Sequence, residues 1–441
     1  MNAASRPSGK TMKAEENDLL TRTDAGTAMG ELMREFWMPA LLSKELPAPD
    51  APPARVRLLG EDLVAFRDSS GRVGLLDAFC PHRRAELYFG RNEAGGLRCI
   101  YHGWKFDVTG QCQETPAEPP GSAMTSRMTI KSYPVRERNG VLWTYMGPKR
   151  ETPPPLPELE WNMVPESHSV VTVRVQECNW LQALEGEIDS AHAAILHGRR
   201  NGSTIAQWRQ GQDLSPKFEV QPHDAGISIA ARRKDGTEHN YVRVNQFLMP
   251  FWTLVPPQMQ YPELSGHAWV PIDDHHTLAF TFSYTPDQPF YEKSRKLFKD
   301  GYKGRETGHH SHGAYEARPV TVPYHRYWSR FNRGNAYNYD YQTGMPGLWL
   351  EDAACQSGVA TICDRSQEHL GSTDAGIVRV RRLLLESAKK LAEGAEPVSA
   401  AKPSSFMMRA ISVTIPAGSD WMELGRDYMK AELGKGFGYT P

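Results

Sequence analysis

Residues 79–107 read FCPHRRAELYFGRNEAGGLRCIYHGWKFD, and this stretch decides how the N-terminal part of the chain folds. Within it, Cys80 and His82 stand two positions apart, and Cys99 and His102 stand three apart. Short alternating apolar segments separated by Gly, Asp and Asn turns surround both pairs, which predicts antiparallel hairpins. Two hairpin tips would then each present one sulfur and one nitrogen, so that two Cys and two His converge on one metal site.

Two thiolates and two neutral imidazoles suit a binuclear iron-sulfur centre. The thiolates can hold one ferric iron, while the imidazoles on the other iron reduce the cluster's negative charge and raise its reduction potential. Pro81 and Gly103 fit the tight loops around such a centre. A Cys2His2 zinc site uses the same residue types, but zinc fingers usually place two cysteines in one knuckle, so pairs of one Cys with one His favour the cluster. We expect buried thiols at the remaining cysteines, which are Cys112, Cys178, Cys355 and Cys363.

Length and composition predict a folded protein of more than one domain. The chain has 441 residues, 39% of them hydrophobic and 23% charged, and single domains usually run to about 100–200 residues. The 51 basic and 52 acidic residues leave a net charge of -1, so no overall field favours nucleic acid or an anionic membrane. The sequence contains neither a run of about 18 apolar residues nor the apolar segment of a secretory signal. We therefore expect a cytoplasmic protein.

The pattern of apolar residues divides the chain into four parts. Helical spacing from Asn17 to Trp37 predicts an N-terminal helix that Pro39 stops. The proline-rich stretch ETPPPLPELE is typical of a stiff connector between domains. The expected parts are a helical segment, a small β domain, this connector and a larger mixed domain, at residues 1–40, 41–150, 151–160 and 161–441.

The larger domain mixes strands with helices. Alternating segments in residues 216–286 predict strands, and helices are expected near 348–363 and 374–393. Residues 290–322 are polar and weakly periodic, which indicates a long loop. The fold class is thus α+β, with an all-β N-terminal domain and a second domain built on an antiparallel sheet. Because the sequence has no G-x-G-x-x-G loop, we expect no nicotinamide site in the chain itself.

A second group of metal-binding residue types lies in NWLQALEGEIDSAHAAILHG, residues 179–198. Asp189 and His192 are three apart and share a helix face. His192 and His197 are five apart, about 140° out of alignment on a regular helix, so a bulge or broken turn is needed before both can bind one ion. Two imidazoles with one carboxylate are typical of iron(II) sites that keep positions open for O2. Either histidine alone would be an ordinary core or surface residue.

The two motifs together resemble the large subunit of the Rieske non-haem iron ring-hydroxylating oxygenases, over nearly the whole chain. The family pattern is Cys-x-His and Cys-x-x-His, here with 16 residues between them, followed by Asp-x-x-His-x4-His. The resemblance implies a helix-grip, START-like catalytic domain, and one [2Fe-2S] cluster with one mononuclear Fe(II) per subunit. The implied cluster ligands are Cys80, His82, Cys99 and His102, and the implied iron ligands include His192 and His197.

The resemblance also assigns roles to residues beside the histidines. Asn179 and Trp180 match the family's Asn-Trp pair ahead of the helix, and Asn179 is a candidate catalytic residue. Asp189 matches a bridging aspartate, which would accept hydrogen bonds from an iron-ligating His and from a cluster-ligating His of a neighbouring subunit. This arrangement implies a homotrimer with head-to-tail contacts, or a dimer of such trimers.

The third iron ligand must come from elsewhere in the chain. Asp352, in GLWLEDAACQSG, resembles the acid at the start of a C-terminal helix in the phthalate dioxygenase subgroup. That subgroup has an amide before the Asp, whereas this chain has Glu351, which makes Glu351 a competing ligand. A shift of one residue on a helix points about 100° away, so Asp352 is the preferred candidate. The following DRSQEHL, residues 364–370, strengthens the subgroup match and is interpreted as structural or as an interface loop.

The resemblance implies a reaction in which a separate flavin and iron-sulfur reductase delivers electrons from NAD(P)H, and O2 attacks an aromatic substrate. Cis-dihydroxylation is the leading outcome, with monooxygenation or O-demethylation of an aromatic ether as the alternative. An aromatic carboxylate such as a phthalate or benzoate is expected, because Arg243 and, more weakly, Arg209 could pair with a carboxylate. A surface ion pair is the competing role for Arg243. The aromatic residues Phe247, Phe251 and Trp252 could stack on a ring but fit core packing better.

Other possibilities stay open from the sequence. The histidines of GHHSHG, which are His309, His310 and His312, could bind metal but are expected to be solvated. A pure electron carrier of the Rieske ferredoxin type would not need His192 and His197. A zinc-dependent regulator would be colourless, whereas an iron-sulfur protein absorbs visible light.

Overall fold

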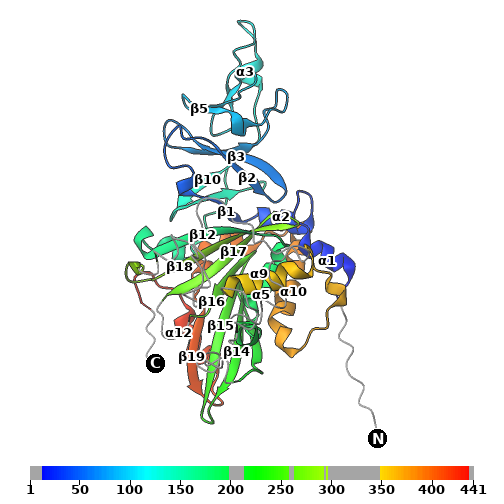
Figure 1. Ribbon diagram of the computed structural model, residues 1–441, viewed down its shortest axis with the longest axis vertical. Coiled ribbons are helices and arrows are strands. Elements are labelled where there is room, and N and C mark those ends of the chain that lie inside the picture. Colours follow the sequence, from blue (N-terminus) through cyan, green and yellow to red (C-terminus); the bar gives the residue numbers. More distant parts are fainter. Residues whose placement is uncertain (1–11, 198–212, 258–262, 293–294, 296–347, 437–441) are drawn as a thin grey trace, which may run out of the picture.

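The computed structural model describes residues 12–197, 213–257, 263–292, 295 and 348–436. Figure 1 shows an elongated molecule in which small β-sheets form one end and a large sheet with flanking helices forms the other. The predicted α+β class, with an all-β N-terminal domain before a domain built on an antiparallel sheet, is confirmed. In the described part of the chain, every helix is too short or too polar to cross a bilayer.

The N-terminal segment forms two short helices, so the single helix expected from Asn17 to Trp37 is wrong. Helix α1 spans Ala14–Thr21 and α2 spans Ala28–Arg34. The chain breaks between them because the carboxylate of Asp274, from the large domain, accepts the backbone N–H of Thr23 at 2.8 Å. Thr27 then caps α2 by accepting the N–H of Gly30. A tertiary contact therefore overrides the helical spacing.

Three small antiparallel sheets form the N-terminal domain. Their strand orders are β1-β11-β10, β2-β3-β4-β9 and β5-β6-β7-β8. The strands are β1 Trp37–Leu42, β2 Ala54–Leu58, β3 Glu61–Arg67, β4 Val73–Asp77, β5 Arg91–Glu93, β6 Gly96–Arg98, β7 Lys105–Phe106, β8 Cys112–Glu114, β9 Ser132–Tyr133, β10 Val135–Arg138 and β11 Val141–Tyr145. One short helix, α3 (Met124–Arg127), follows β8.

The large domain is an eight-stranded antiparallel sheet of order β12-β18-β17-β16-β15-β14-β13, with β19 paired to β15. Its strands are β12 Ser169–Gln176, β13 Lys217–His223, β14 Gly226–Asp235, β15 His239–Leu248, β16 Trp252–Val255, β17 Leu264–Asp273, β18 His276–Tyr284 and β19 Ile411–Pro416. The helices are α4 Glu160–Met163, α5 Trp180–Ile188, α6 Ala193–Leu196, α9 Leu348–Val359, α10 Ala375–Ala392, α11 Val398–Ala401 and α12 Trp421–Met429. Short 3-10 turns lie at Ser43–Glu45, Leu87–Phe89, Glu166–His168, Arg365–Gln367, Ser372–Asp374 and Pro403–Phe406.

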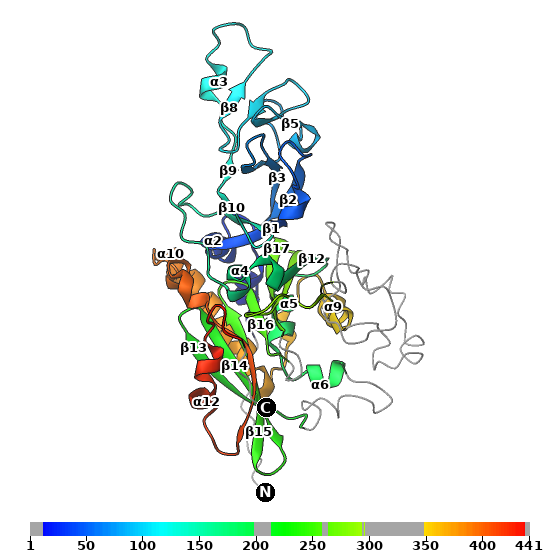
Figure 2. The same ribbon diagram turned by 90° about the vertical axis from the view of Figure 1, so that its left-hand side faces the viewer.

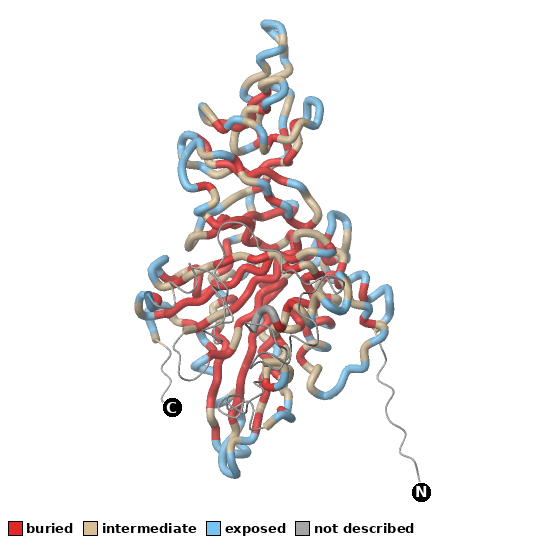
Figure 3. The backbone as a smooth tube through the Cα atoms, viewed as in Figure 1, coloured by how far each residue is buried: buried red, intermediate tan, exposed pale blue. Residues whose placement is uncertain are grey.

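The two hydrophobic cores that bear on the candidate sites lie in different parts of the molecule. The larger core joins α2 and β1 to the large sheet and to α5, and Figure 3 shows the buried backbone concentrated along that sheet. A smaller, separate core lies in the N-terminal domain and contains Cys80 and Cys99 with Phe66, Trp104 and Phe106. The cysteines of the first motif thus belong to a core of their own.

The sheet buries different side chains on its two faces because successive residues of a strand alternate in direction. On β15, Val242 and Val244 pack with Trp421 of α12 on one face. Asn245, on the opposite face, donates its amide to the backbone oxygen of Glu187 in α5 at 3.1 Å. Helix α5 therefore covers the face of β15 that carries Asn245, and this contact positions the second motif.

Candidate metal centres

The four residues of the first motif come together at adjacent loops, as the hairpin pattern predicts. Cys80 and Cys99 are buried at 1% and 2% exposure, whereas His82 is exposed and His102 is half-buried. The two imidazole rings meet edge to face with centroids 4.5 Å apart. His82 also stacks on Trp104 at 4.7 Å, which fixes the orientation of its ring. The site thus has a sulfur side inside the domain and a nitrogen side at its surface.

Backbone hydrogen bonds shape the two loops. The N–H of Cys80 donates to the oxygen of Ala85 at 2.9 Å, and the N–H of Cys99 donates to the oxygen of Trp104 at 2.8 Å. Gly103 closes the second loop with a φ of +75°, where a Cβ would meet Pro116 at 2.7 Å. A residue without a side chain is therefore required at this position.

The buried thiols fit a cationic metal centre. Burial and the adjacent Cys99 raise the pKa of Cys80, although the backbone N–H of His82 donates to its sulfur and lowers that pKa. A bound cation reverses this preference because it stabilises the thiolate form. Two buried sulfurs beside two accessible imidazoles match the unequal halves of a Rieske cluster.

Helix α5 ends at Ile188, and only the one-turn helix α6 (Ala193–Leu196) separates the two histidines, with His197 already outside helical geometry at φ -88° and ψ 11°. The irregular backbone that the spacing of the histidines required is therefore present. Asp189 is extended, with ψ of 100°, and its side chain accepts the N–H of Ala191 at 2.8 Å. Arg233, 1% exposed on β14, donates to the backbone oxygen of Ser190 at 2.6 Å and holds this turn. His192 and His197 then stand at the two ends of the short helix α6.

Asp352 of α9 lies between the two histidines. One oxygen of its carboxylate, Oδ1, is 3.3 Å from Nε2 of His192 and 3.4 Å from Nε2 of His197. Potential ligand atoms of the three residues all lie within 4.8 Å of one another. Two nitrogens and one oxygen that converge from one side could hold a divalent ion and leave its other positions open.

Carboxylates surround this pair of imidazoles. Nδ1 of His192 is 3.3 Å from Oδ2 of Asp189. Although burial opposes protonation, the hydrogen bonds to Asp189 and Asp352 raise the pKa of His192 to about 10. Burial likewise opposes ionisation of Asp352, but the nearby His197 and His192 lower its pKa. The site has an excess of negative charge that attracts a cation, and a metal ion would take the place of the imidazole proton.

Glu351, the competing ligand, faces the far side of His197. Its Oε2 lies 2.7 Å from Nδ1 of His197, and its side chain is fully buried. The carboxylates of Glu351 and Asp352 thus occupy different nitrogens of one ring, as the offset of neighbouring residues on a helix requires. Sequence reasoning identified the residue but did not predict this contact.

Helix α9 is held against α5 at close range, and Figure 2 shows the two helices side by side. The side chain of Gln182 donates to the backbone oxygens of Gln356 and Ala360 at 2.7 and 2.8 Å. A Cβ on Gly186 would lie 2.1 Å from the side chain of Gln356, so α5 needs glycine at this crossing. These contacts fix Asp352 relative to the histidines.

The DRSQEHL segment supplies a second attachment for α5. Arg365 is fully buried and its Nη2 donates to Glu185 of α5 at 2.8 Å. Arg381 of α10 reaches the same carboxylate at 2.6 Å and also pairs with Glu368. Despite burial, which disfavours the carboxylate, the two arginines lower the pKa of Glu185. The predicted structural role of this segment agrees with these contacts.

Asn179 lies at the N-terminal end of α5 and forms hydrogen bonds to the scaffold around that end. Its Oδ1 accepts the N–H of Leu181 at 3.1 Å, which caps the helix. Its amide nitrogen donates to the backbone oxygens of Thr21 and Asp274, each at 2.8 Å. The structure therefore places Asn179 where it can orient α5, one helix length from Asp189.

Of the two candidate substrate residues, Arg243 lies in the described part of the chain. Arg243 is buried on the face of β15 that also carries Asn245, and it donates to the backbone oxygen of Pro256 at 2.9 Å. Arg174 of β12 was missed by the sequence reasoning: it is buried, donates to Thr281 at 2.8 Å, and its charge helps to lower the pKa of Asp352. No sequence signal indicated it, because the alternation VTVRVQ groups Arg174 with Thr172 and Gln176, and a polar set of this kind predicts a solvent-facing side of the strand.

The structure also places the aromatic residues of the β15 region and the remaining cysteines. The aromatic residues on and after β15 belong to the main core, namely Phe247, Phe251 and Trp252. Cys112 and Cys178 are buried, but Cys355 is exposed and Cys363 is half-buried, so the expectation of buried thiols is wrong for the last two. Four candidate residues named from the sequence lie outside the described part of the chain, namely Arg209, His309, His310 and His312.

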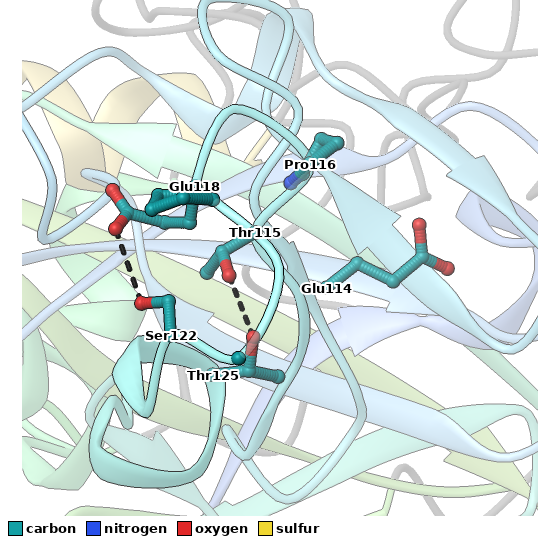
Figure 4. A pocket seen from close by; sticks show the side chains of 8 residues that line it. Glu114, Thr115, Pro116, Glu118, Ser122 and Thr125 are labelled. Carbon is teal, nitrogen blue, oxygen red and sulfur yellow. Dashed lines mark hydrogen bonds between the residues drawn. The ribbon is translucent and has the colours of Figure 1, made fainter.

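A surface pocket of about 330 Å³ lies at the far end of the N-terminal domain. Figure 4 shows its loop, in which Thr115 and Thr125 share a hydroxyl hydrogen bond of 2.6 Å and Ser122 donates to Glu118. The residues that line this pocket do not include any predicted metal ligand or substrate residue. The pocket borders the loop of the first candidate centre, because Pro116 lines the pocket and lies against Gly103.

Two protein families match the chain. The Rieske [2Fe-2S] domain matches residues 36–134, and the family described as LigXa C-terminal domain like matches residues 144–438. Dicamba monooxygenase with bound dicamba has the same fold, with a TM-score of 0.57 at 20% identity over 82% of this chain and 99% of that chain. The first match supports an iron-sulfur cluster, and not zinc, in the N-terminal domain.

Curated relatives match over most of their length. The 3-chlorobenzoate-3,4-dioxygenase oxygenase subunit of Comamonas testosteroni is 36% identical, over 85% of this chain and 88% of that protein. The phthalate 4,5-dioxygenase oxygenase subunit of Pseudomonas putida is 36% identical, over 95% of each. The 5,5'-dehydrodivanillate O-demethylase oxygenase subunit of Sphingobium sp. is 32% identical, over 88% of this chain and 82% of that protein. Because these matches span both domains, the chain belongs to the Rieske non-haem iron oxygenases and is the oxygenase component of such a system.

Proposed function

We propose that this chain oxygenates an aromatic carboxylate at a mononuclear Fe(II) held by His192, His197 and Asp352. The observation that carries the proposal is the approach of both Nε2 atoms to one oxygen of Asp352, at 3.3 and 3.4 Å. Two imidazoles and one carboxylate are the ligand set by which non-haem iron(II) keeps neighbouring positions free. Bound there, the iron would supply O2 activation once it receives electrons.

The residues around the proposed iron prepare the site for it. The carboxylates of Asp189 and Glu351 each face the Nδ1 of one histidine, which leaves both Nε2 atoms directed toward Asp352. The side chains of His192 and Asp352 are 25% and 28% exposed, so one side of the proposed iron would stay open to substrate and O2. Arg174 adds a positive charge within electrostatic reach of Asp352.

Electrons would enter from a separate reductase that oxidises NAD(P)H, because the relatives are named as oxygenase subunits of larger systems. The cluster and the iron ligands lie in different domains, and Figure 1 places β5 and α5 in opposite halves of the chain. Asp189 keeps a side-chain exposure of 23% beside His192. We place its accessible side against the histidine face of a neighbouring subunit's cluster, in a homotrimer or a dimer of trimers with head-to-tail contacts.

The substrate class is inferred from the relatives and from buried arginines. The names of two relatives refer to chlorobenzoate and phthalate, both of which are aromatic acids. Arg243 offers a guanidinium on the face of the sheet that α5 covers, and Arg209 is the second candidate. A guanidinium can hold a carboxylate through two parallel hydrogen bonds, which would orient the ring relative to the iron. Cis-dihydroxylation is the expected outcome.

O-demethylation is the second candidate, because a relative of 32% identity carries that activity in its name. It needs the same metal ligands, but one atom of O2 would enter the methyl group and the other would be reduced to water. A methoxybenzoate would then release formaldehyde in place of forming a diol.

Product analysis tests the proposal. The purified chain would be incubated with a reductase, NADH, isotopically labelled O2 and a panel of phthalates, chlorobenzoates, methoxybenzoates and neutral arenes. We expect both labelled atoms in a cis-diol of an acid, and no product from Asp352→Ala. Arg243→Ala should reduce turnover of acids about 10-fold or more, given the strength of a charge-assisted pair, and affect neutral arenes much less. Equal loss for acids and arenes would contradict the carboxylate assignment, and turnover by Asp352→Ala would contradict the iron site.

A further inference from the structure

Glu351 forms a buried contact with His197 on the side of the ring away from Asp352. Its carboxylate lies 2.7 Å from Nδ1 of His197, and the side chain exposures are 0% for Glu351 and 7% for His197. Glu351 directly precedes Asp352 on α9, so one helix delivers a carboxylate to each nitrogen of the same ring. The contact is shorter and more buried than the one between Asp189 and His192, which measures 3.3 Å.

The geometry distinguishes this residue from a metal ligand. The two nitrogens of an imidazole point in widely divergent directions, so a group that contacts Nδ1 lies away from a metal on Nε2. Asp352 is the carboxylate that approaches the Nε2 atoms of both histidines. Glu351 is thus positioned to accept a hydrogen bond from the N–H of the ring, and not to share the metal.

A carboxylate in this position has two effects on the ring. It keeps the proton on Nδ1, which leaves the lone pair of Nε2 available to a metal. Its negative charge also makes Nε2 a stronger donor, and burial keeps that charge from being screened by salt or water. Since the distance is short and both side chains are buried, the ring has little freedom to rotate away.

We propose that Glu351 is a positioning residue that fixes the tautomer and orientation of His197 and sets the affinity of the mononuclear site for Fe(II). This inference rests on the proposed iron site at His192, His197 and Asp352. The two carboxylates beside the histidines would have different roles. Asp189 is partly accessible and can face a neighbouring subunit, whereas Glu351 is enclosed and acts only within its own chain. A subgroup in which an amide occupies this position would lack the negative charge.

The test measures metal affinity in the full-length, cluster-containing protein. Its mononuclear site would be emptied with a chelator and titrated with Fe(II) against a competing indicator, and the nitric oxide adduct of the bound Fe(II) would be recorded by EPR. Glu351→Gln keeps the shape and an acceptor oxygen but removes the charge, while Glu351→Ala removes both. We expect Fe(II) binding about 10- to 100-fold weaker in Glu351→Ala, an intermediate loss in Glu351→Gln, and altered nitrosyl spectra.

A nearby pair provides the matched control. Glu187 of α5 contacts Nδ1 of His267 at 2.9 Å, and both side chains are largely buried, but His267 is not among the proposed ligands. Glu187→Gln removes a carboxylate charge of the same kind and should leave Fe(II) affinity and the nitrosyl spectrum as in the parent. Circular dichroism and denaturant unfolding of the catalytic domain report whether each variant has folded.

The possible outcomes separate the two proposals. If the parent protein binds no Fe(II) beyond its cluster, the iron site is wrong and the role of Glu351 falls with it. If the parent binds Fe(II) but Glu351→Gln retains the parent affinity and nitrosyl spectrum, the iron site stands and the positioning role is overturned. An equal loss in Glu187→Gln and Glu351→Gln would also overturn it, because the effect would then be general electrostatics. If Glu351→Ala fails to fold, the comparison between the two glutamine variants decides.

Discussion

The two metal centres of this chain are assembled in opposite ways. The proposed cluster ligands all lie between Cys80 and His102 on neighbouring loops, and their cysteines belong to a small separate core. The proposed iron site joins α6 to α9, and its contact between His197 and Glu351 links residues 154 positions apart. The first centre therefore depends on local loop geometry, whereas the second depends on how α5 and α9 pack. Changes that affect one centre without the other test this difference.

The largest expected effect is a reciprocal loss of the two metals. Cys80→Ala should remove the cluster and its visible absorption entirely, because a cluster needs all four of its ligands. The same variant should still bind mononuclear Fe(II), since the cysteine core, within the part of the chain that the structure describes, contains no residue of α5 or α9. Asp352→Ala should do the reverse. Absorption spectra and EPR of the nitric oxide adduct measure both, and loss of both metals in either variant would show that the centres are not independent.

This difference also explains what the sequence could predict. The convergence of the four proposed cluster ligands follows from spacing, because four residues on two adjacent hairpin tips have few ways to be arranged. The irregular backbone between His192 and His197 was expected, because the two residues cannot share a face of a regular helix, and the one-turn helix between them indeed ends at His197. The division of the N-terminal helix was not, because it depends on Asp274, a residue 251 positions from its partner Thr23.

The same limit applies to the partners of the iron ligands. Asp352 was found through a resemblance, but the contact between Glu351 and His197 needs the rotation of α9 relative to α6. Arg365 was placed in a segment interpreted as structural, yet no local pattern indicates that it pairs with Glu185 of α5. Spacing within a motif is encoded locally, whereas partners across helices are set by packing.

The next largest effect should come from the buried link to α5. Arg365→Met leaves Glu185 with one buried arginine in place of two, and breaking a buried charge pair costs about 3–5 kcal/mol. We expect the catalytic domain to unfold at lower denaturant concentration and Fe(II) affinity to fall, while the cluster spectrum persists. The control Lys402→Met removes an ion pair with Asp224 in which both side chains are over 50% exposed, and its shift should be much smaller. Equal shifts in the two variants would argue against a special role for the buried link.

Acid should reduce the difference between the parent and Arg365→Met. The arginines lower the folded-state pKa of Glu185 below its ordinary value of 4.5, so their stabilisation is complete above that value and is lost as the pH falls through the lowered pKa. Denaturant midpoints of both proteins between neutral pH and the acid limit of folding measure this. A difference that stays constant down to the acid limit would mean that Glu185 is not the group responsible.

The smallest expected effect comes from a helix cap in the catalytic domain that is remote from α5 and α9. Asp420 caps α12 by accepting the N–H of Met422 at 2.8 Å, and α12 packs on the face of the sheet opposite α5. Asp420→Ala should cost about 1 kcal/mol of stability, a typical value for a lost cap. Fe(II) affinity and the cluster spectrum should stay as in the parent. The contacts that hold α9 against α5 do not involve α12. Asp420→Asn, which keeps an acceptor oxygen, should recover most of the stability. A loss of Fe(II) affinity in Asp420→Ala would mean that the iron site responds to the stability of the whole domain. It would contradict the claim that Fe(II) binding depends specifically on the packing of α9 against α5.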